Sequence, residues 1–209
     1  LSVLSQPMIV RSAGEEKHTI GLFSQQATDG WREHAFASGT QYKLKQADDG
    51  VWALSADSQD GASAYFKAVD IDLDKTPILH WRWQVLEPLI GLPEMSKVGD
   101  DYAARVYVVH KRGFFDKGTA INYVWSGSYP VGARWPNAFA KQSSVMIALR
   151  NHQSPLGQWQ SESRDVRKDF LELMGEDVRS IQLVVLMTDT DNSGLAAGAL
   201  YGDLFFSER

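Results

Sequence analysis

Short runs of β-forming residues, each closed by turn residues, follow one another along most of this sequence. The runs cover residues 41–45, 51–56, 63–72, 78–85, 103–110, 119–126, 143–150, 180–188 and 199–206. Strands in quick succession, without the helices of βαβ units between them, are typical of a sandwich or barrel. The pattern therefore predicts an all-β, jelly-roll-like sandwich of two antiparallel sheets with about eight to ten strands.

Local patterns within these runs predict turns and faces. Asp48-Asp49-Gly50 predicts a tight hairpin between the first two runs, because Asp-Gly accepts positive φ. Residues 78–85 alternate strictly, with Leu, Trp, Trp and Val on one face and His, Arg and Gln on the other. Residues 103–110 carry apolar side chains at both sets of positions, so we expect both faces of that strand to be covered.

One helix is expected near residues 165–174. Asp165 can cap its start and Gly175 can end it. Its apolar residues recur at helical spacing, namely Val166, Phe170, Leu173 and Met174. We expect this helix to close one opening of the sandwich.

No internal repeat, linker or charge block divides the chain. We therefore predict one domain over residues 1–209, with residues 1–20 as an N-terminal arm that has room for one short strand. The longest loops are expected at residues 87–99 and 127–142, and both are candidates to line a binding mouth.

Composition excludes several classes of function. The chain has 21 Lys and Arg against 26 Asp and Glu, a net charge of −5, so no global basic field favours nucleic acid or an anionic membrane. No apolar run is long enough to insert in a bilayer. Because the chain has 0 Cys, disulfides, thiolate nucleophiles, iron–sulfur centres and Cys-type zinc sites are excluded.

Familiar catalytic patterns are absent from the sequence. It has no G-x-S-x-G, no H-E-x-x-H, no G-x-G-x-x-G and no P-loop. It also lacks the closely spaced Glu and Asp of many jelly-roll glycosidases. These absences favour a non-enzymatic protein.

The string Thr188-Asp-Thr-Asp-Asn-Ser-Gly194 offers a candidate metal site. Asp189, Asp191 and Ser193 take alternate positions before the glycine, like the first half of a calcium loop. The twelfth position is Leu200 rather than Glu, so this is not an EF-hand. A structural calcium and a tight turn shaped by Asp and Asn hydrogen bonds both remain open, and no other cofactor is expected.

A second polar cluster consists of Asp100, Asp101 and Arg105. One interpretation is a buried fork in which an aspartate pairs with the arginine. The other is that these groups bind the hydroxyls or the carboxylate of a ligand.

Aromatic and amide side chains form the third cluster. Asn122, Tyr123 and Trp125 lie on one predicted strand, and Trp135 follows in the next loop. Sugar rings stack on indole faces while Asn, Asp and Arg bind hydroxyls, so this mixture suits a glycan cleft. Arg82 is a further candidate to anchor a ligand.

Taken together, these strings resemble the DUF3047 family of bacterial proteins. The resemblance extends over about residues 21–206 and is carried by Leu79-His-Trp-Arg-Trp-Gln-Val85, Gly99-Asp-Asp-Tyr-Ala-Ala-Arg-Val-Tyr-Val108, Ile121-Asn-Tyr-Val-Trp-Ser126, Trp159 with Arg164-Asp-Val166 and Asp169, Met187-Thr-Asp-Thr-Asp-Asn192 and Tyr201-Gly-Asp203. It implies an exported protein, usually made with a signal peptide, with no assigned activity. The layout of Gly30-Trp31 and Lys67-Ala-Val-Asp-Ile-Asp-Leu73 is also similar to the galactose-binding-like jelly rolls of carbohydrate-binding modules.

The leading hypothesis is a periplasmic or exported β-sandwich that binds a saccharide or another polyhydroxylated ligand. Arg82 and Arg105 would anchor the ligand, and Trp125 and Trp135 would stack on it. A polysaccharide-acting enzyme is the alternative, with acid and base drawn from Asp100, Asp101, Asp189 and Asp203, and with Tyr123 or His110 assisting. An envelope scaffold is a third possibility. The sequence leaves the oligomeric state open.

Overall fold

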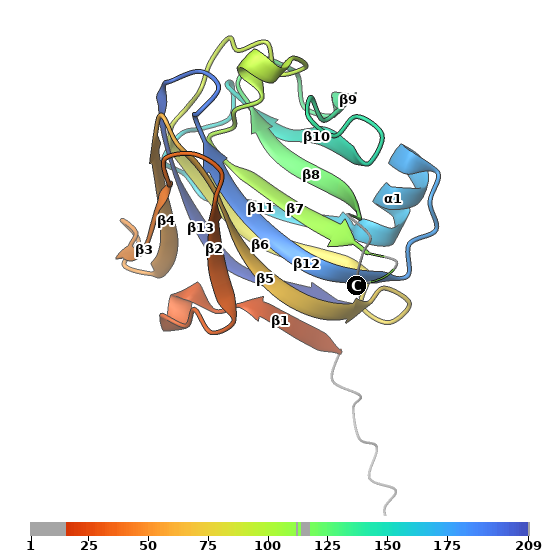
Figure 1. Ribbon diagram of the computed structural model, residues 1–209. Helices are drawn as coiled ribbons and strands as arrows, with labels where there is room; N and C mark the ends of the chain where they lie inside the picture. Colours follow the sequence, from red (N-terminus) through yellow and green to blue (C-terminus); the bar gives the residue numbers. More distant parts are fainter. Residues whose placement is uncertain (1–15, 112, 114–117, 209) are drawn as a thin grey trace, which may run out of the picture.

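Two packed β-sheets form the body of the protein, which confirms the predicted β-sandwich (Figure 1). The computed structural model describes residues 16–111, 113 and 118–208. The expected arm therefore lies mostly outside the described residues, and its one short strand is β1 (Lys17–Gly21). No helix in the described part of the chain has the length and apolar character that a membrane span requires.

The six-stranded sheet has the order β11-β6-β13-β4-β3, and β1 pairs with the far half of β13. Its remaining strands are β3 (Gln41–Gln46), β4 (Trp52–Gln59), β6 (Ile78–Glu87), β11 (Gln160–Asp165) and β13 (Ala196–Ser207). The predicted turn joins β3 to β4, where Gly50 has φ +80° and Asp49 accepts a hydrogen bond from the backbone N–H of Val51.

The seven-stranded sheet has the order β2-β5-β12-β7-β8-β10-β9. Its strands are β2 (Trp31–Ala35), β5 (Ala62–Asp72), β7 (Arg105–His110), β8 (Thr119–Ser126), β9 (Arg134–Pro136), β10 (Ser144–Asn151) and β12 (Ser180–Asp189). Its described pairs are antiparallel except β8 with β10, which is parallel. The sheet is thus mixed rather than purely antiparallel, because a long connection carrying β9 returns the chain to the same end before β10 begins.

Every run predicted as a strand is a strand, whereas β2, β9 and β11 were not predicted. β9 and β11 lie at sheet edges, and β2 is the opposite edge of its sheet. β2 and β11 are mostly polar, with exposed side chains in β2 and exposed or half-buried ones in β11, and β9 has three residues. Edge strands of this kind lack the buried alternation that identifies a strand in a sequence.

Aromatic side chains fill the space between the sheets. Trp81 and Trp83 of β6 meet Tyr123 and Trp125 of β8, with ring centroids 5.3 Å apart for Trp81–Tyr123 and 6.0 Å apart for Trp83–Trp125. The alternation expected for β6 is confirmed, because its Leu, Trp and Val side chains are buried in this core. Such buried aromatic contacts hold the two sheets in a fixed relation.

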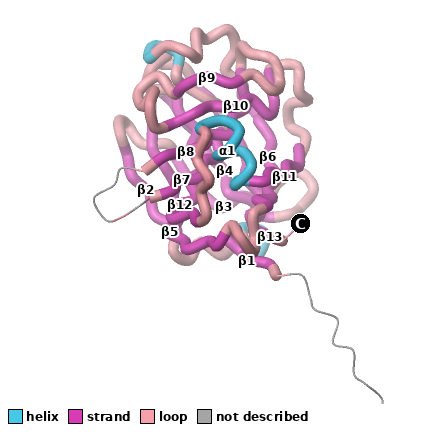
Figure 2. Tube along the Cα trace, turned by 90° about the vertical axis from the view of Figure 1, so that its right-hand side faces the viewer, coloured by secondary structure: helices cyan, strands magenta, loops and turns pink. Residues whose placement is uncertain are grey.

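The predicted helix is α1 (Val166–Met174). The Asp165 side chain accepts a hydrogen bond from the backbone N–H of Lys168, and Gly175 ends the helix with φ +71°. Val166 and Phe170 enter the core, and Figure 2 shows α1 between β8 of one sheet and β6 and β11 of the other. Two short 3₁₀ helices, η1 (Phe23–Gln25) and η2 (Lys97–Gly99), lie in loops.

Candidate functional site

A cavity of about 480 Å³ opens on the outer face of the seven-stranded sheet, and we call it the pocket. Its floor is made by side chains of four neighbouring strands, namely Arg105 and Tyr107 of β7, Asn122 of β8, Ser144 of β10, and Met187 and Asp189 of β12. Its walls are Phe36, Ala62, Asp191 and Asn192 toward β2 and β5, and Asp100, Asn137, Phe139 and Ala140 toward β9. The volume is in the range of small-ligand sites.

Strand alternation explains why these side chains face outward. Val106 and Val108 of β7 lie in the core between the sheets, so Arg105 and Tyr107 point to the opposite face. Tyr107 is directly opposite Asn122 on β8, so the two polar side chains share that face.

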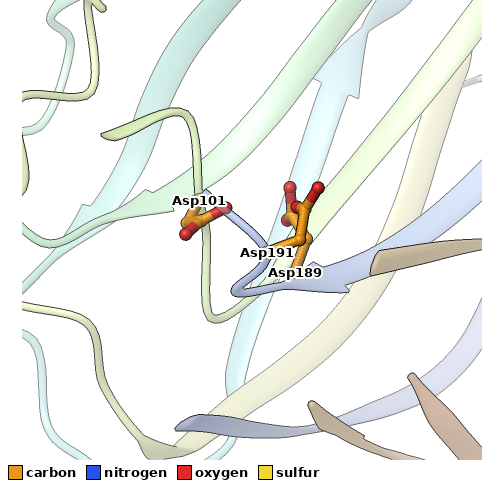
Figure 3. A group of neighbouring side chains, drawn as sticks. All are labelled: Asp101, Asp189 and Asp191. Atoms are coloured by element: carbon orange, nitrogen blue, oxygen red, sulfur yellow. The ribbon is translucent and has the colours of Figure 1, made fainter. Parts of the chain in front are cut away.

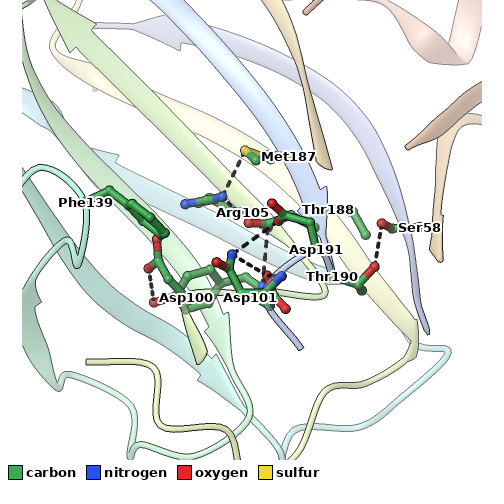
Figure 4. Close-up of polar contacts among 12 residues, drawn as sticks. Ser58, Asp100, Asp101, Arg105, Phe139, Met187, Thr188, Thr190 and Asp191 are labelled. Carbon is green, nitrogen blue, oxygen red and sulfur yellow. Dashed lines mark hydrogen bonds and ion pairs between the residues drawn. The ribbon is translucent and has the colours of Figure 1, made fainter. Parts of the chain in front are cut away.

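Arg105 is the most unusual group in the pocket, because only 5% of it is exposed. Its Nη2 donates to Asp189 Oδ2 at 2.6 Å and to Met187 Sδ at 2.9 Å. Figure 4 shows the contact with Met187. Its Nε is buried without a partner, and Nη1 has no hydrogen bond within the described residues. A buried donor without an acceptor is costly and rare in native proteins. The expected fork with Asp100 or Asp101 is therefore replaced by a pair with Asp189 of β12.

Two buried carboxylates lie beside this guanidinium. Burial raises the pKa of Asp189 above its usual range, whereas the Arg105 guanidinium, 2.6 Å away, opposes this effect and favours the carboxylate form. Burial also raises the pKa of Asp100, which accepts hydrogen bonds from the Tyr102 hydroxyl at 3.1 Å and from Asn137 Nδ2 at 3.2 Å. Both groups retain oxygen lone pairs that a ligand hydroxyl can use.

Asp101, Asp189 and Asp191 form a group in which one carboxylate oxygen from each residue lies within 4.8 Å of the other two (Figure 3). Asp101 accepts hydrogen bonds from both backbone N–H groups of the turn, at Asn192 (3.2 Å) and Ser193 (2.6 Å). Burial and the neighbouring Asp101 raise the pKa of Asp191. A cation bound here would share Asp101 with the turn and Asp189 with Arg105, so the structure offers both the hydrogen-bonded turn and a set of three carboxylates, and the metal site stays a prediction.

Ser193, the third predicted metal ligand, takes part in this turn through both its backbone N–H and its hydroxyl. Its Oγ lies 3.5 Å from the carbonyl oxygen of Thr190, and the backbone N–H of Gly194 also donates to that carbonyl, at 2.8 Å. Ser193 is not among the residues that line the pocket.

Asn122 is held in place on the pocket floor. Its Nδ2 donates to Ser144 Oγ at 2.8 Å and to the carbonyl oxygen of Val145 at 3.2 Å. Both amide donors are thus used, which leaves the amide oxygen for a ligand.

Two exposed phenylalanines stand on the walls of the pocket. Phe36 is 60% exposed and Phe139 is 58% exposed. The turn that carries Phe139 is fixed by Asn137, whose Oδ1 accepts from the backbone N–H of Phe139 and of Ala140, each at 3.0 Å. Exposed aromatic rings on the walls of a cavity that also carries charged and amide groups are suited to contact the apolar face of a ring-shaped ligand.

Of the two loops expected to line a mouth, only residues 127–142 do so. The loop at residues 87–99 supports it from behind through Glu94. The Glu94 carboxylate accepts hydrogen bonds from Ser126 Oγ at 2.7 Å and from the backbone N–H of Gly127 at 2.6 Å. Burial raises the pKa of Glu94 to about 7.

The structure brings five of the predicted site residues together in the pocket: Asp100, Arg105, Asn122, Asp189 and Asp191. The others lie elsewhere. Tyr123 and Trp125 are on the opposite side of β8, in the core, where 2% of Trp125 is exposed. Trp135 is 3% exposed and donates through Nε1 to the Tyr102 hydroxyl. These indole rings are packed against the protein and are not presented to a ligand.

Sequence reasoning did not identify Tyr107, Phe36 or Phe139. Tyr107 had a readable signal, because it alternates with Arg105 on one strand and so shares its face. Phe139 lay within a loop expected to line a mouth, but no pattern distinguished it from its neighbours. Phe36 follows an unpredicted edge strand and had no signal.

Arg82, the remaining candidate, lies on the outer face of the other sheet. Its guanidinium carbon is 4.2 Å from the centroid of the Trp159 ring, and its Nη1 is 3.7 Å from Asp49 Oδ2. It borders a separate, smaller cavity of about 290 Å³ together with His80, Glu162 and Asp203. Arg82 and Asp203 therefore cannot act on a ligand in the pocket.

Comparisons with known proteins agree with this architecture. A family model described as "Protein of unknown function (DUF3047)" matches residues 29–205. No curated protein matches the sequence.

Among solved structures, the family 11 carbohydrate-binding module of a cellulosomal cellulase of Clostridium thermocellum is similar. It matches with a TM-score of 0.50, 9% identity, and coverage of 94% of this chain and 95% of that chain. A family 29 carbohydrate-binding module from Piromyces equi matches with a TM-score of 0.38, 11% identity and coverage of 93% and 87%. At these identities the first likeness shows the fold alone, and the second carries no argument.

Proposed function

The chain belongs to the DUF3047 family, and we propose that it binds a saccharide, or another polyhydroxylated ligand, in the pocket. The observation that carries the proposal is that one cavity contains both hydrogen-bond donors without a partner and carboxylate oxygens that can accept further hydrogen bonds. Arg105 has N–H groups without partners, and the carboxylates of Asp100, Asp189 and Asp191 line the same space. Each sugar hydroxyl both donates and accepts, so a sugar can use both kinds of group at once.

The free donors of Arg105 give the binding a driving force. A buried donor without a partner destabilises the empty protein by about 1–3 kcal/mol. A ligand oxygen placed against the guanidinium would remove that penalty and form a charge-assisted hydrogen bond. Phe36 and Phe139 would contact the C–H faces of the sugar rings from the two walls.

The similarity to a carbohydrate-binding module supports the proposal at the level of fold only, because one fold hosts many functions. The family resemblance implies a periplasmic or exported location, where a protein would have access to polysaccharides. That location remains part of the proposal.

A glycan array followed by titration tests the proposal. We expect the wild-type protein to bind at least one glycan and its thermal midpoint to rise with that glycan, because a ligand of the native state must stabilise it. Ala140→Trp fills one wall of the pocket and should abolish binding. Leu156→Trp places the same ring at an exposed position outside the pocket and is the matched control. Equal binding by both variants, or no binding by the wild type, would reject the proposal.

A polysaccharide-acting enzyme is a second candidate, favoured by one observation. Asp100 and Asp189 line the same open pocket, and burial raises the pKa of both. Carboxyl groups with raised pKa values in a cleft are suited to acid–base catalysis. Incubation with each glycan that binds, followed by an assay for new reducing ends and for unsaturated products, distinguishes an enzyme from a binding protein.

A further inference from the structure

The charged groups of the pocket are not balanced. Arg105 is the only Lys or Arg among the described residues that line it, whereas Asp100, Asp189 and Asp191 all do. The carboxyl groups also affect one another, because Asp100 and Asp101 both raise the pKa of Asp189. The pocket therefore already opposes further negative charge.

Asp189 determines what Arg105 can offer to a ligand. The two side chains are 7% and 2% exposed and form an ion pair of 2.6 Å. The guanidinium favours the ionised form of Asp189 against the effect of burial. At this separation, away from water, the carboxylate offsets most of the positive charge of the guanidinium. Arg105 keeps N–H groups for a ligand oxygen, but it does not give the pocket a positive potential.

These observations limit the class of ligand. A ligand carboxylate on Arg105 would lie beside the Asp189 carboxylate, and like charges at close range repel strongly where water is excluded. A cationic ligand would suit the aspartates but would leave the buried Nε of Arg105 without an acceptor. A neutral polyol supplies acceptors to the arginine and donors to the aspartates without adding charge.

We infer that the pocket selects neutral sugars over uronic acids, and that Asp189 is the residue that excludes the acidic ones by neutralising Arg105. This inference rests on the proposed saccharide binding and adds the class of sugar. It assigns Asp189 a role in specificity, in which its charge matters more than its hydrogen bond.

The test uses matched sugars that differ only at C6: cellohexaose, mannohexaose and galactohexaose, each beside its C6-oxidised uronate form, together with any array hit and its carboxylated derivative. We expect the wild-type protein to bind the neutral member of a pair at least about tenfold more tightly at pH 7. Asp189→Asn keeps the size and one acceptor oxygen and frees the charge of Arg105. In this variant the preference should fall to about threefold or less, or reverse.

Two further variants keep the test informative if Asp189→Asn folds poorly. Asp191→Asn removes a carboxylate from an exposed turn and should shift the preference in the same direction by a smaller factor. Asp57→Asn removes the same charge from β4 of the six-stranded sheet, outside the pocket lining. Asp57 is about half exposed and lies 3.7 Å from Lys43, so this variant should leave the preference unchanged.

The outcomes separate this inference from the proposed function. Equal or tighter binding of the uronate forms by the wild type would overturn the inference while leaving saccharide binding intact. An unchanged preference in both Asp189→Asn and Asp191→Asn would overturn the role of Asp189. Absence of binding to every pair and to the array would overturn the proposed function, and this inference with it.

Discussion

Arg105 and Arg82 occupy similar positions on the two sheets, but their surroundings differ. Each projects from the outer face of a strand that has a neighbour on both sides. Arg82 is about one third exposed, lies against the Trp159 ring and is 3.7 Å from Asp49. Arg105 is buried, is 2.6 Å from Asp189 and borders the larger cavity.

The two faces therefore differ in how the charge of an arginine is compensated. On the six-stranded face, the protein covers its arginine with its own indole ring and leaves the charge to solvent. On the seven-stranded face, buried carboxylates surround the arginine and part of its hydrogen-bonding capacity is unused. Charges on the pocket face should therefore control both binding and pH dependence, whereas those on the opposite face should have small effects.

The largest expected effect is on the pH dependence of stability, through Glu94. Its pKa is raised from an ordinary value of 4.5 to about 7 in the folded protein. The unfolded chain therefore releases this proton at lower pH than the folded protein does. Stability from this group is fully present below pH 4.5 and is lost as the pH rises through 7, by up to about 3 kcal/mol.

Glu94→Gln should flatten this loss, measured as the free energy of unfolding in urea at pH 5, 6, 7 and 8. Glu87→Gln, at the end of β6 on the other sheet, is the control and should keep the wild-type slope. Asp189 contributes with the same sign, since its pKa is also raised, so part of the slope should survive in Glu94→Gln. An identical slope in wild type and Glu94→Gln would contradict the role of this buried carboxyl group.

The next effect is on affinity and compares the two arginines directly. Arg105→Gln should weaken glycan binding by roughly 10- to 100-fold, because hydrogen bonds to a charged group contribute about 1.5–3 kcal/mol. Arg82→Gln removes the same charge from the other face and should change affinity by less than about twofold. Calorimetric titration with the best glycan measures both. Similar losses in the two variants would mean that the two faces are not functionally distinct.

A smaller effect is expected from the aromatic residues. Phe36→Ala and Phe139→Ala should each weaken binding by about fivefold, since an aromatic contact contributes about 0.5–1.5 kcal/mol. Their stability should change little because both rings are exposed. Trp159→Ala should do the reverse, lowering the thermal midpoint and leaving affinity unchanged. If Trp159→Ala weakened binding more than the phenylalanine variants, the ligand would have to lie on the six-stranded face.

The smallest effect concerns calcium. The oxygens of Asp101 and Asp189 are engaged by the turn and by Arg105. We therefore expect less than about 1 °C of difference in thermal midpoint between protein in calcium and protein in chelator. A larger rise that disappears in Asp191→Asn would establish the metal site that the Asp189, Asp191 and Ser193 spacing suggested.

The strands and the helix could be predicted because each depends on a local sequence pattern. Period-two alternation identified β6 and β8, Asp-Gly identified the β3–β4 turn, and Asp165 with Gly175 bounded α1. The edge strands β2, β9 and β11 were not predicted because they lack the regular alternation of buried and exposed residues that identifies a strand in a sequence. The strand β10 was predicted, but its parallel pairing with β8 was not, because strand order is a tertiary property that no local signal encodes.

The site was predictable only where alternation could be read. Arg105 and Asn122 project outward from strands whose inner faces are plainly apolar, and both belong to the pocket. Trp125 was assigned to the ligand for its chemistry, although it has the same parity as Ile121 and Tyr123 on the core side of β8. The ion-pair partner of Arg105, Asp189, lies 84 residues away in the sequence, so this pairing could not be predicted from neighbouring residues.

The parallel pairing of β10 with β8 has a consequence for how this protein can change during evolution. A strand that returns in the same direction cannot be joined by a tight hairpin, so the connection that carries Asn137 and Phe139 has to be long. Insertions, deletions and substitutions in the loops of such a segment leave the pairing of β10 with β8 intact. One wall of the pocket is thus free to diversify while the floor stays constant, and relatives that bind different ligands should differ first in this connection. The same segment is the natural place to graft or randomise residues when a new binding specificity is sought.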